Sequence, residues 1–379
     1  MTRNPKEIML VVGEASGDAH GAQLVKAVLE RDPNIRFFGV AGEQLAQTKF
    51  EGLLSVAKLT GMGLSELLGN LGNVWHGYRL LRRALRERRP NLLVLIDFPE
   101  FNLRLAKLAK KLHIPVLYYI SPQVWAWRRH RVRQIARWVD RMAVIFPFEL
   151  AFYQQHGVNV SFVGHPLLDA VHVRDSREAA LTRLGLDLNK PTVALLPGSR
   201  RKELAAHLPV MLDAANRLRS ERNIQFFCVR ASTVETREIE NMLNATSMII
   251  PVVTEDRYDA VNAADLVWTA SGTATVETAL LLKPMIIVYR LSWLTYWIAR
   301  LLVHVDHVGM ANLIAGERVV PELVQSEFKA ERIVKESRLI LDNPQVRSRI
   351  IAKLSSLRER LGSSGAASRV ADLALAMMA

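Results

Sequence analysis

The sequence contains one cysteine, Cys228, among its 379 residues. A single cysteine excludes an internal disulfide and any cluster of thiolate metal ligands, and its place in an apolar stretch predicts a buried, unreactive thiol. No stretch approaches the roughly 20 consecutive apolar residues that a membrane-spanning helix needs. The nearest one, Leu291 to Val303, is shorter and contains Arg300. Any contact with a membrane is therefore expected to be peripheral.

Signatures of metal and cofactor sites are also missing. The histidines lie among unlike neighbours, and no His/Cys/Asp cluster has the spacing of a metal site. The Asp-x-Asp signature of metal-bound sugar nucleotides is absent. The loop Gly13 to Asp18 lacks the Gly-x-Gly-x-x-Gly pattern of dinucleotide sites, which argues against hydride chemistry. We therefore expect no metal ion and no cofactor.

The sequence has fewer acidic than basic residues: 37 Asp and Glu against 50 Lys and Arg, which gives a formal net charge of +13. This balance favours anionic partners such as nucleic acid, an anionic lipid surface or a phosphorylated substrate. Nothing indicates a nucleic-acid-binding fold, so no nucleic acid is expected.

The segment Met1 to Glu7 leads into a short strand and not into the apolar core of a signal peptide, which predicts a cytoplasmic protein.

Apolar strand patterns alternate with helical patterns along the chain, as in parallel sheets that helices cover on both faces. The strands predicted in the first half are residues 8–12, 36–40, 92–96, 114–120, 141–146 and 160–163. Those predicted in the second half are residues 192–196, 225–230, 248–252, 265–269 and 285–289. The sequence therefore predicts an α/β protein of two doubly wound units with a boundary near Gly164 to Arg174. A helical tail is expected from about Ala330, and its last helix near 366–378.

Three polar loops directly follow predicted strands, which is where open α/β sheets bind ligands. They are Glu14-Ala15-Ser16-Gly17-Asp18, Ser121-Pro122-Gln123-Val124-Trp125-Ala126-Trp127-Arg128 and Pro197-Gly198-Ser199-Arg200. Trp125 and Trp127 suit an acceptor with an apolar body, although two tryptophans can equally be packed beneath the loop. Carboxylates in the first loop would repel a pyrophosphate, so Ser16 and Gly17 are assigned to the acceptor.

Two segments have the character of a nucleotide site. In Pro197 to Arg200, glycine allows close approach of the backbone, the following helix start offers free amides, and Arg200 can bind phosphate in a bidentate manner. In Ser271-Gly272-Thr273-Ala274-Thr275-Val276-Glu277, hydroxyl groups can touch phosphate and Glu277 can accept hydrogen bonds from ribose. Helix capping alone is the alternative explanation for both segments.

Asp97 ends the predicted strand 92–96 and lies beside Phe98 and Phe101 in the sequence. Apolar neighbours raise the proton affinity of a carboxylate, as a general base acting on a sugar hydroxyl requires. Glu100 is the nearby competitor for that role. An aspartate that only orients the loop is the alternative.

Two further segments combine a helical pattern with arginines. Met62 to Leu85 carries an apolar stripe followed by a basic cluster, which fits either a core helix or an interfacial helix on anionic lipid. The arginines from Arg128 to Arg141 fit a solvated helix face, a phosphate site or a nucleic-acid contact. Their position favours an acceptor phosphate for Arg128 or Arg129.

Taken in order along nearly the whole chain, these motifs resemble those of the lipid-A-disaccharide synthases, bacterial glycosyltransferases that join two acylated glucosamines. The resemblance also rests on Gly164-His165-Pro166, Ile96-Asp97-Phe98-Pro99-Glu100-Phe101-Asn102 and Asn312-Leu313-Ile314-Ala315-Gly316. It implies the glycosyltransferase-B architecture, in which two Rossmann-like domains face a cleft. The implied domains are residues 1–168 for the acceptor and 169–361 for the UDP-sugar donor. The end of the chain, about 362–379, would return to the first domain, and in this family the return can be exchanged within a homodimer.

The resemblance also implies roles for single residues. Asp97 would be the base, Arg200 would stabilise the leaving UDP, and Asn312 would lie in the active site, although Met310 and Ala311 precede it where Leu-Pro is expected. The implied donor-binding residues are Gly198, Ser199, Arg200, Ser271, Gly272, Thr273, Glu277 and Asn312. The implied acceptor-binding residues are Glu14, Ser16, Gly17, Ser121, Gln123, Trp125, Trp127 and Arg128.

The implied reaction transfers a sugar from UDP-2,3-diacylglucosamine to the 6-hydroxyl of 2,3-diacylglucosamine 1-phosphate with inversion, giving a β-1,6 disaccharide and UDP. The enzyme would associate peripherally with the anionic inner membrane. One alternative is another UDP-N-acetylglucosamine enzyme of the same fold, a peptidoglycan transferase or a 2-epimerase, against which the tryptophan loop argues. The other is a basic membrane- or nucleic-acid-binding protein without catalysis, which would leave the donor loops unexplained.

Overall fold

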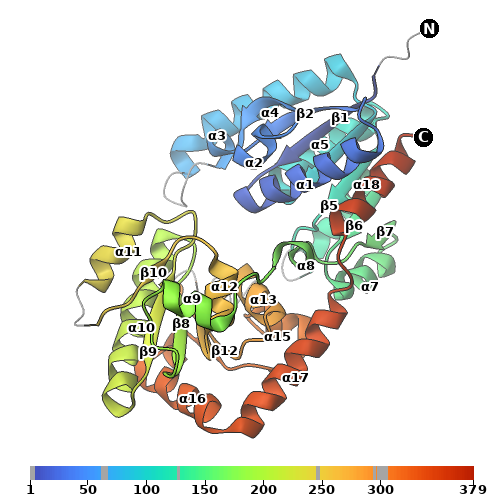
Figure 1. The fold of residues 1–379 in the computed structure, drawn as a ribbon. Helices are drawn as coiled ribbons and strands as arrows, with labels where there is room; N and C mark the ends of the chain where they lie inside the picture. Colours follow the sequence, from blue (N-terminus) through green and yellow to red (C-terminus); the bar gives the residue numbers. More distant parts are fainter. Residues whose placement is uncertain (1–4, 61–66, 126–128, 245–247, 293–295, 297–305) are drawn as a thin grey trace. The chain divides into compact units, whose positions relative to one another are not determined.

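The computed structural model describes residues 5–60, 67–125, 129–244, 248–292, 296 and 306–379. The chain forms two compact units, Met1–Pro166 together with Leu361–Ala379, and Leu167–Arg360 (Figure 1). Each unit contains a parallel β-sheet whose strands alternate with helices along the chain. This arrangement confirms the predicted α/β class with two doubly wound sheets.

The sheet of the first unit has the strand order β3-β2-β1-β4-β5-β6-β7. Its strands are β1 (Glu7–Val12), β2 (Arg36–Ala41), β3 (Phe50–Ser55), β4 (Leu92–Ile96), β5 (Val116–Tyr119), β6 (Arg141–Val144) and β7 (Val160–Phe162). Its helices are α1 (Ala15–Arg31), α2 (Glu43–Ala46), α3 (Val56–Thr60), α4 (Leu67–Arg88), α5 (Pro99–Lys111), α6 (Val132–Trp138), α7 (Pro147–Gln155) and α18 (Ala366–Met377), with the short 3-10 helix η1 (Arg129–Arg131) before α6. All of β4 and residues 8–12 of β1 are apolar and fully buried, as expected of parallel strands covered on both faces.

The order of the first sheet reverses at β1, which pairs with β2 on one side and β4 on the other. Val12 lies opposite Ile96, so β1 and β4 end at the same level. At such a switch point the loops after the two strands separate, and open α/β sheets bind ligands between them. The loops beginning at Gly13 and Asp97 occupy this position.

The sheet of the second unit has the order β10-β9-β8-β11-β12-β13. Its strands are β8 (Thr192–Leu196), β9 (Gln225–Val229), β10 (Val252–Val253), β11 (Leu266–Ala270), β12 (Met285–Tyr289) and β13 (Glu322–Val324). Its helices are α8 (Leu167–Ala170), α9 (Arg177–Arg183), α10 (Arg201–Glu221), α11 (Thr236–Leu243), α12 (Arg257–Ala263), α13 (Thr273–Leu280), α15 (Met310–Ala315), α16 (Ala330–Asp342) and α17 (Pro344–Arg360), with η2 (Gln325–Glu327) after β13. Here the switch point lies between β8 and β11, whose ends pair at Leu196 and Thr269. The loops starting at Pro197 and Ser271 follow these two strands.

The end of the chain completes the first unit. After α16 and α17, helix α18 packs against α1, where Figure 1 shows the red and blue helices side by side. Arg31 pairs with Asp372 at 2.7 Å, and Arg369 donates to the Val163 carbonyl at 2.9 Å. Gly164 has a φ of +77°, and a Cβ there would lie 2.8 Å from the Arg369 guanidinium, so this return requires glycine.

Two strands were not predicted and one was displaced. β3 and β13 are edge strands: β3 is half exposed and contains Glu51, and β13 has three residues. The strand predicted at 248–252 is instead the two-residue β10. Among the helices of the described residues, none is long and apolar enough to span a membrane.

Candidate active site

Asp97 and Phe98 lie directly after β4 in left-handed backbone conformations, with φ values of 48° and 49°. Non-glycine residues occupy this region at a cost, and clusters of them occur at functional sites. Two side chains hold the conformation: the Tyr118 hydroxyl and the Asn102 amide both donate to the Asp97 carbonyl, the second at 2.7 Å. The backbone turn that aims the Asp97 carboxyl is therefore fixed by the buried core beneath it.

The surroundings of Asp97 favour its protonated form. Burial, and to a smaller extent the negative charge of Glu14, raise the pKa of the Asp97 carboxyl to about 6. The loops of the two residues touch, since a Cβ at Gly13 would lie 2.3 Å from the Phe98 Cβ. A carboxylate with a pKa close to the working pH is suited to accept a proton in a reaction.

Glu100, the competing candidate, has a different environment. It lies in the first turn of α5 and is more than half exposed, with an ion pair to Arg131 at 2.8 Å. The Arg131 guanidinium therefore already occupies the Glu100 carboxylate at the surface. The geometry therefore favours Asp97 over Glu100.

The loop after β1 divides its side chains between the surface and the interior. Glu14 and Ser16 are exposed at the start of α1, and Gly17 is buried. Asp18 is buried, and its carboxylate accepts hydrogen bonds from the Gly42 and Gln44 amides, each at 2.7 Å. Asp18 thus caps α2, while Glu14 and Ser16 remain available to a ligand.

The tryptophan loop is anchored from below. Trp125 is only 9% exposed, its indole N–H donates to Glu149 at 3.2 Å, and its ring packs edge-on against Phe148. Of the two interpretations of Trp125, packing beneath the loop is the one that the structure supports. Gln123 is exposed. Trp127 and Arg128 lie outside the described residues.

Glu149 was not predicted. Its carboxyl group is buried on α7, where it also accepts a hydrogen bond from the Phe146 amide at 3.2 Å. Burial raises its pKa to about 8. The neighbouring Tyr153 hydroxyl is hydrogen-bonded to Ser121, which links the start of the loop to the same helix. An acidic residue inside an otherwise apolar helix start was the available sequence signal.

The loop after β8 closes on its own helix. Gly198 has a φ of +131°, and the Ser199 amide donates to the Glu203 carboxylate at 2.9 Å. A Cβ at Gly198 would lie 2.6 Å from Glu203. Arg200 is exposed as the N-cap of α10. The Ser199 amide, which could donate to a phosphate oxygen, thus donates to the Glu203 carboxylate in this structure.

His207 connects two of these loops and was also not predicted. The Arg290 amide donates to its Nε2 at 3.0 Å, so the neutral ring carries its proton on Nδ1, which lies 2.8 Å from the Pro197 carbonyl. Burial lowers the pKa of His207 and keeps the ring neutral. It therefore ties the loop after β8 to the end of β12.

The loop after β11 presents Ser271, Gly272 and Thr273 at the start of α13. Ser271 donates to the Val308 carbonyl at 2.8 Å, and Thr273 is exposed. Glu277 accepts hydrogen bonds from Arg257 at 2.7 Å and from the Tyr258 hydroxyl at 3.0 Å. The predicted ribose acceptor is therefore already paired with a cation, and Arg257 joins the set of candidate site residues.

Asn312, for which the resemblance implied a place in the active site, lies in the interior of the second unit. It is fully buried on α15. Its Oδ1 accepts from the Val319 and Val320 amides, and its Nδ2 donates to the Val320 carbonyl and to Glu322. Each hydrogen-bonding position of its amide is thus used within the unit. Asn312 therefore orders the backbone around α15, and its role in donor binding stays a prediction.

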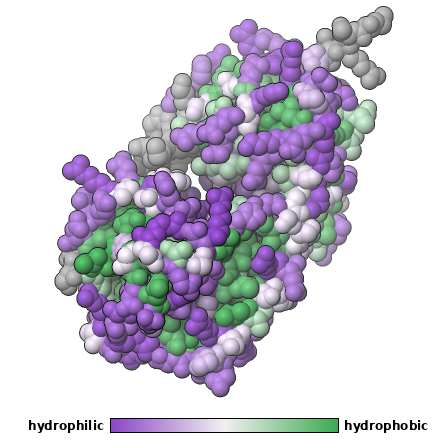
Figure 2. Space-filling model, in the orientation of Figure 1, coloured by the Kyte–Doolittle hydropathy of each residue, from purple (hydrophilic) through white to green (hydrophobic). Residues whose placement is uncertain are grey.

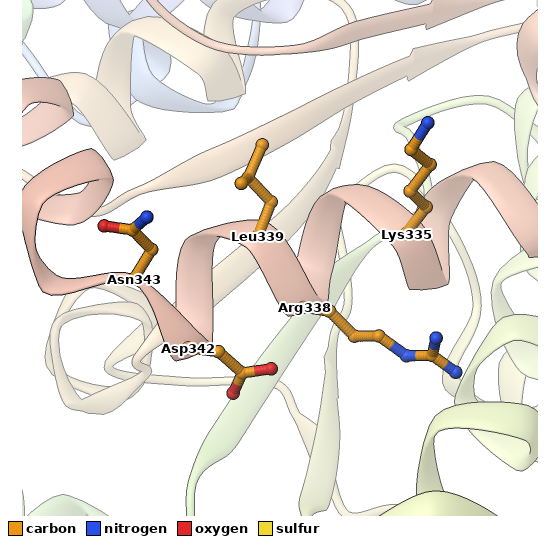
Figure 3. Close-up of a pocket in the computed structure, with 5 residues that line it drawn as sticks. All are labelled: Lys335, Arg338, Leu339, Asp342 and Asn343. Atoms are coloured by element: carbon orange, nitrogen blue, oxygen red, sulfur yellow. The ribbon is translucent and has the colours of Figure 1, made fainter.

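Among the described residues, no group of three or more His, Cys, Asp or Glu side chains could hold a metal ion. A surface depression on α16 is lined by Lys335, Arg338, Leu339, Asp342 and Asn343. Figure 3 shows that these side chains leave a single helix in different directions, and Arg338 and Asp342 pair with Glu221 and Arg222. Nothing converges on the depression, so it is not a candidate site.

Comparison with known proteins agrees with the geometry at the two switch points. The sequence model of the family described as Lipid-A-disaccharide synthetase matches residues 8–375. The chain belongs to the lipid-A-disaccharide synthase family. It is 46% identical to the lipid-A-disaccharide synthase of Geobacter metallireducens over 374 residues, which cover 98% of this chain and 97% of the relative. It is 47% identical to that of Syntrophus aciditrophicus over 378 residues, 99% of this chain and 98% of the relative.

Solved structures extend the likeness of this lipid-A-disaccharide synthase fold to distant relatives. The UDP-GlcNAc 2-epimerase of Neisseria meningitidis bound to UDP-GlcNAc matches with a TM-score of 0.66 at 11% identity, covering 98% of this chain and all of that one. The glycotransferase of kitacinnamycin matches with a TM-score of 0.63 at 14% identity, covering 100% of both chains. At such low identity these matches show the fold, which is the glycosyltransferase-B fold of two Rossmann-like domains.

Proposed function

We propose that this chain transfers the sugar of UDP-2,3-diacylglucosamine to the 6-hydroxyl of 2,3-diacylglucosamine 1-phosphate, forming the β-1,6-linked lipid A disaccharide and UDP. Membership of the family supports the reaction. The observation that carries the chemistry is the environment of Asp97, a half-buried carboxyl at the first switch point with a pKa raised to about 6. It suits the removal of a proton from a sugar hydroxyl near neutral pH.

The proposed mechanism is a single displacement. Asp97 removes the proton of the acceptor hydroxyl as its oxygen attacks the anomeric carbon from the face opposite UDP, so the configuration inverts. The exposed Arg200 guanidinium and the amides at the start of α10 receive the negative charge that develops on the leaving diphosphate. A phosphate oxygen that takes the Ser199 amide displaces the Glu203 carboxylate from it. These groups need no metal ion, so we propose that the reaction is independent of divalent cations.

The donor nucleotide is proposed to lie at the second switch point, with its ribose near Glu277. Glu277 is 14% exposed and is held by Arg257, a cation that is about half exposed. A carboxylate held by a cation and by the Tyr258 hydroxyl keeps a fixed orientation, which suits an acceptor of ribose hydroxyl hydrogen bonds. Arg257 and Arg200 then provide two cations for an anionic donor.

Peripheral binding to an anionic membrane is the proposed role of one face of α4. Leu81 and Leu85 are fully buried, so for that half of the predicted stripe the core interpretation holds. An adjoining face carries Trp75, which is 58% exposed, with the Arg79 guanidinium 4.8 Å above its ring. Exposed Arg82 and Arg86 continue this face at helical spacing. The side chains of Leu68 and Leu71, also part of the stripe, lie outside the described residues.

An exposed tryptophan in line with arginines is typical of a helix at a lipid interface. Figure 2 shows that hydrophilic residues cover most of the face of the molecule that it presents. Among the described residues, Trp75 is one of few large hydrophobic side chains that are exposed. A homodimer with exchanged α18 stays a prediction, which size-exclusion chromatography with light scattering tests.

The test of the proposed function is an assay with both acylated glucosamine substrates, one of them radiolabelled, with and without a chelator. We expect one UDP released per disaccharide formed, and the same rate with the chelator. A 2-epimerase would convert a UDP-sugar without an acceptor, and a binding protein without catalysis would release no UDP. Absence of the disaccharide would overturn the proposed function.

A further inference from the structure

Glu322, the first residue of the edge strand β13, holds three hydrogen-bond donors with one carboxylate. Its Oε1 accepts from the Gly309 amide at 3.0 Å and from the Asn312 side chain at 2.8 Å. Its Oε2 accepts from the Val308 amide at 2.9 Å. A carboxylate that receives several N–H groups fixes their positions more firmly than a neutral acceptor does.

The backbone held in this way is the one that contacts the loop after β11. The Val308 carbonyl accepts the hydrogen bond of Ser271, at 2.8 Å. On its other side the chain is confined, because a Cβ at Gly309 would lie 2.3 Å from the Ile287 side chain and 3.1 Å from Glu322. The peptide between Val308 and Gly309 is therefore fixed both by a carboxylate and by the packing of β12.

Asn312 supplies the second arm of the same arrangement. While its Nδ2 donates to Glu322, its Oδ1 accepts from the amides of Val319 and Val320, at 2.8 and 3.0 Å. These amides directly precede β13. Asn312 therefore holds the backbone that leads into Glu322 and also orients the Glu322 carboxylate.

We propose that Glu322, oriented by Asn312, is a positioning residue for donor binding: it fixes the Val308 carbonyl and thereby aims the Ser271 hydroxyl at the second switch point. This inference rests on the proposed function, because the orientation of Ser271 matters only where a nucleotide binds after β11. It also gives the buried Asn312 a role in the active site that acts through Glu322.

The variants Glu322→Gln and Asn312→Asp test this role. The first replaces one carboxylate oxygen by an amide donor that faces backbone N–H groups; the second places a negative oxygen against Glu322. We expect each to weaken UDP binding about 10-fold, as for the loss of one charge-assisted hydrogen bond. The KM for the donor should rise by a similar factor, whereas the KM for the acceptor should stay within about 2-fold. Calorimetric titration with UDP and initial rates provide these values.

Combining the variants gives a sharper test. In Asn312→Asp with Glu322→Gln, the glutamine amide can donate to the aspartate, which restores their contact with its polarity reversed. We expect the double variant to bind UDP more tightly than the product of the two single effects predicts. In a Ser271→Ala background, Glu322→Gln should produce no further loss of UDP affinity, because the hydroxyl that it aims is gone.

Asp265 provides a matched control in the same unit. Its carboxylate accepts from the Thr192 amide at 2.9 Å and pairs with Arg177 at 3.0 Å. It lies at the amino ends of β8 and β11, opposite the donor loops. Asp265→Asn should lower the melting temperature and leave UDP affinity unchanged.

The outcomes separate the two levels of inference. If Glu322→Gln and Asn312→Asp behave like Asp265→Asn, with lower melting temperatures and unchanged UDP affinity, both residues are structural only and the positioning role is wrong. The same holds if the donor and acceptor KM values rise together. If the wild-type protein itself neither binds UDP nor forms disaccharide, the proposed function is wrong and the positioning role falls with it.

Discussion

The negative charge of Glu14 raises the pKa of the Asp97 carboxyl. Burial of the carboxyl raises the same pKa and has the larger effect. The two residues follow adjacent strands that end at the same level. A general base works only when it is ionised, so kcat/KM should fall about tenfold per unit as the pH drops below about 6. Glu14→Gln should move this acidic limb to lower pH, because one repelling charge is removed. A pH–rate profile of both proteins measures the shift.

Glu100→Gln is the control for this profile. Glu100 contributes the smallest of the charge effects on Asp97 and is ion-paired with Arg131. The acidic limb of the pH–rate profile should therefore move less in Glu100→Gln than in Glu14→Gln. Coincident profiles for Glu14→Gln and the wild type would show that Glu14 does not act on the reacting base.

Asp97→Asn should abolish most of the turnover, because the amide keeps the shape of the side chain and cannot accept a proton. Loss of a general base typically costs about 10²–10⁴-fold in rate. UDP affinity, measured by calorimetry, should stay nearly unchanged. Asp97 belongs to the first unit, whereas the proposed donor loops belong to the second. A variant within a few-fold of the wild-type rate would remove Asp97 from the mechanism.

Arg200→Ala should weaken UDP binding and slow transfer together, because the exposed guanidinium is proposed to neutralise the diphosphate both in the complex and in the leaving group. Calorimetric titration and initial rates would be compared with those of Arg201→Ala. Arg201 is the next residue, and its ion pairs with Glu235 and Glu238 occupy its side chain. Equal effects of the two substitutions would show that Arg200 has no specific role in binding the diphosphate.

The buried carboxyl of Glu149 should make stability depend on pH. Its pKa in the folded protein is raised to about 8, above the ordinary value of 4.5. The associated stability is therefore fully present below that ordinary value and is lost as the pH rises through about 8. Melting temperatures across this range should fall more for the wild type than for Glu149→Gln, whose side chain does not ionise. Parallel curves would show that Glu149 is not buried as a neutral acid.

Membrane contact by α4 should depend on its exposed face. Trp75→Ser with Arg79→Ser should reduce flotation with anionic vesicles, and high salt should weaken binding of the wild type by screening its arginines. Arg83→Ser is the control, because Arg83 is exposed on the same helix and pairs with Glu87. Leu68→Ser, Leu71→Ser and Trp75→Ser together extend the test. If the folded variants still float like the wild type, the contact lies elsewhere, with 291–303 the next segment to test.

The central strands could be predicted from the sequence because they are uninterrupted apolar runs. β4 and β8 were predicted at their observed bounds. β3 escaped prediction because an edge strand that is half exposed does not need an apolar pattern. Since the reversal of strand order in each sheet follows from which strands pair, it also could not be read from the chain.

The loops of the candidate site were predictable from their positions after strands, but the orientations of their side chains were not. Trp125 points inward because its indole meets Glu149, 24 residues further along the chain. Asn312 is buried because its amide meets Glu322 and the amides of Val319 and Val320. Each orientation depends on a partner supplied by another element, and no local pattern contains that information.

The return of α18 to α1 sets an order of events during synthesis. The first 166 residues leave the ribosome before any part of the second unit, yet the helix that covers α1 is translated after that whole unit. Until then the nascent first unit exposes the surface on which α18 packs, and the ion pair between Arg31 and Asp372 cannot form. The amino-terminal unit therefore reaches its final structure only after the second unit has been made, so the first half of the polypeptide is the last to be completed.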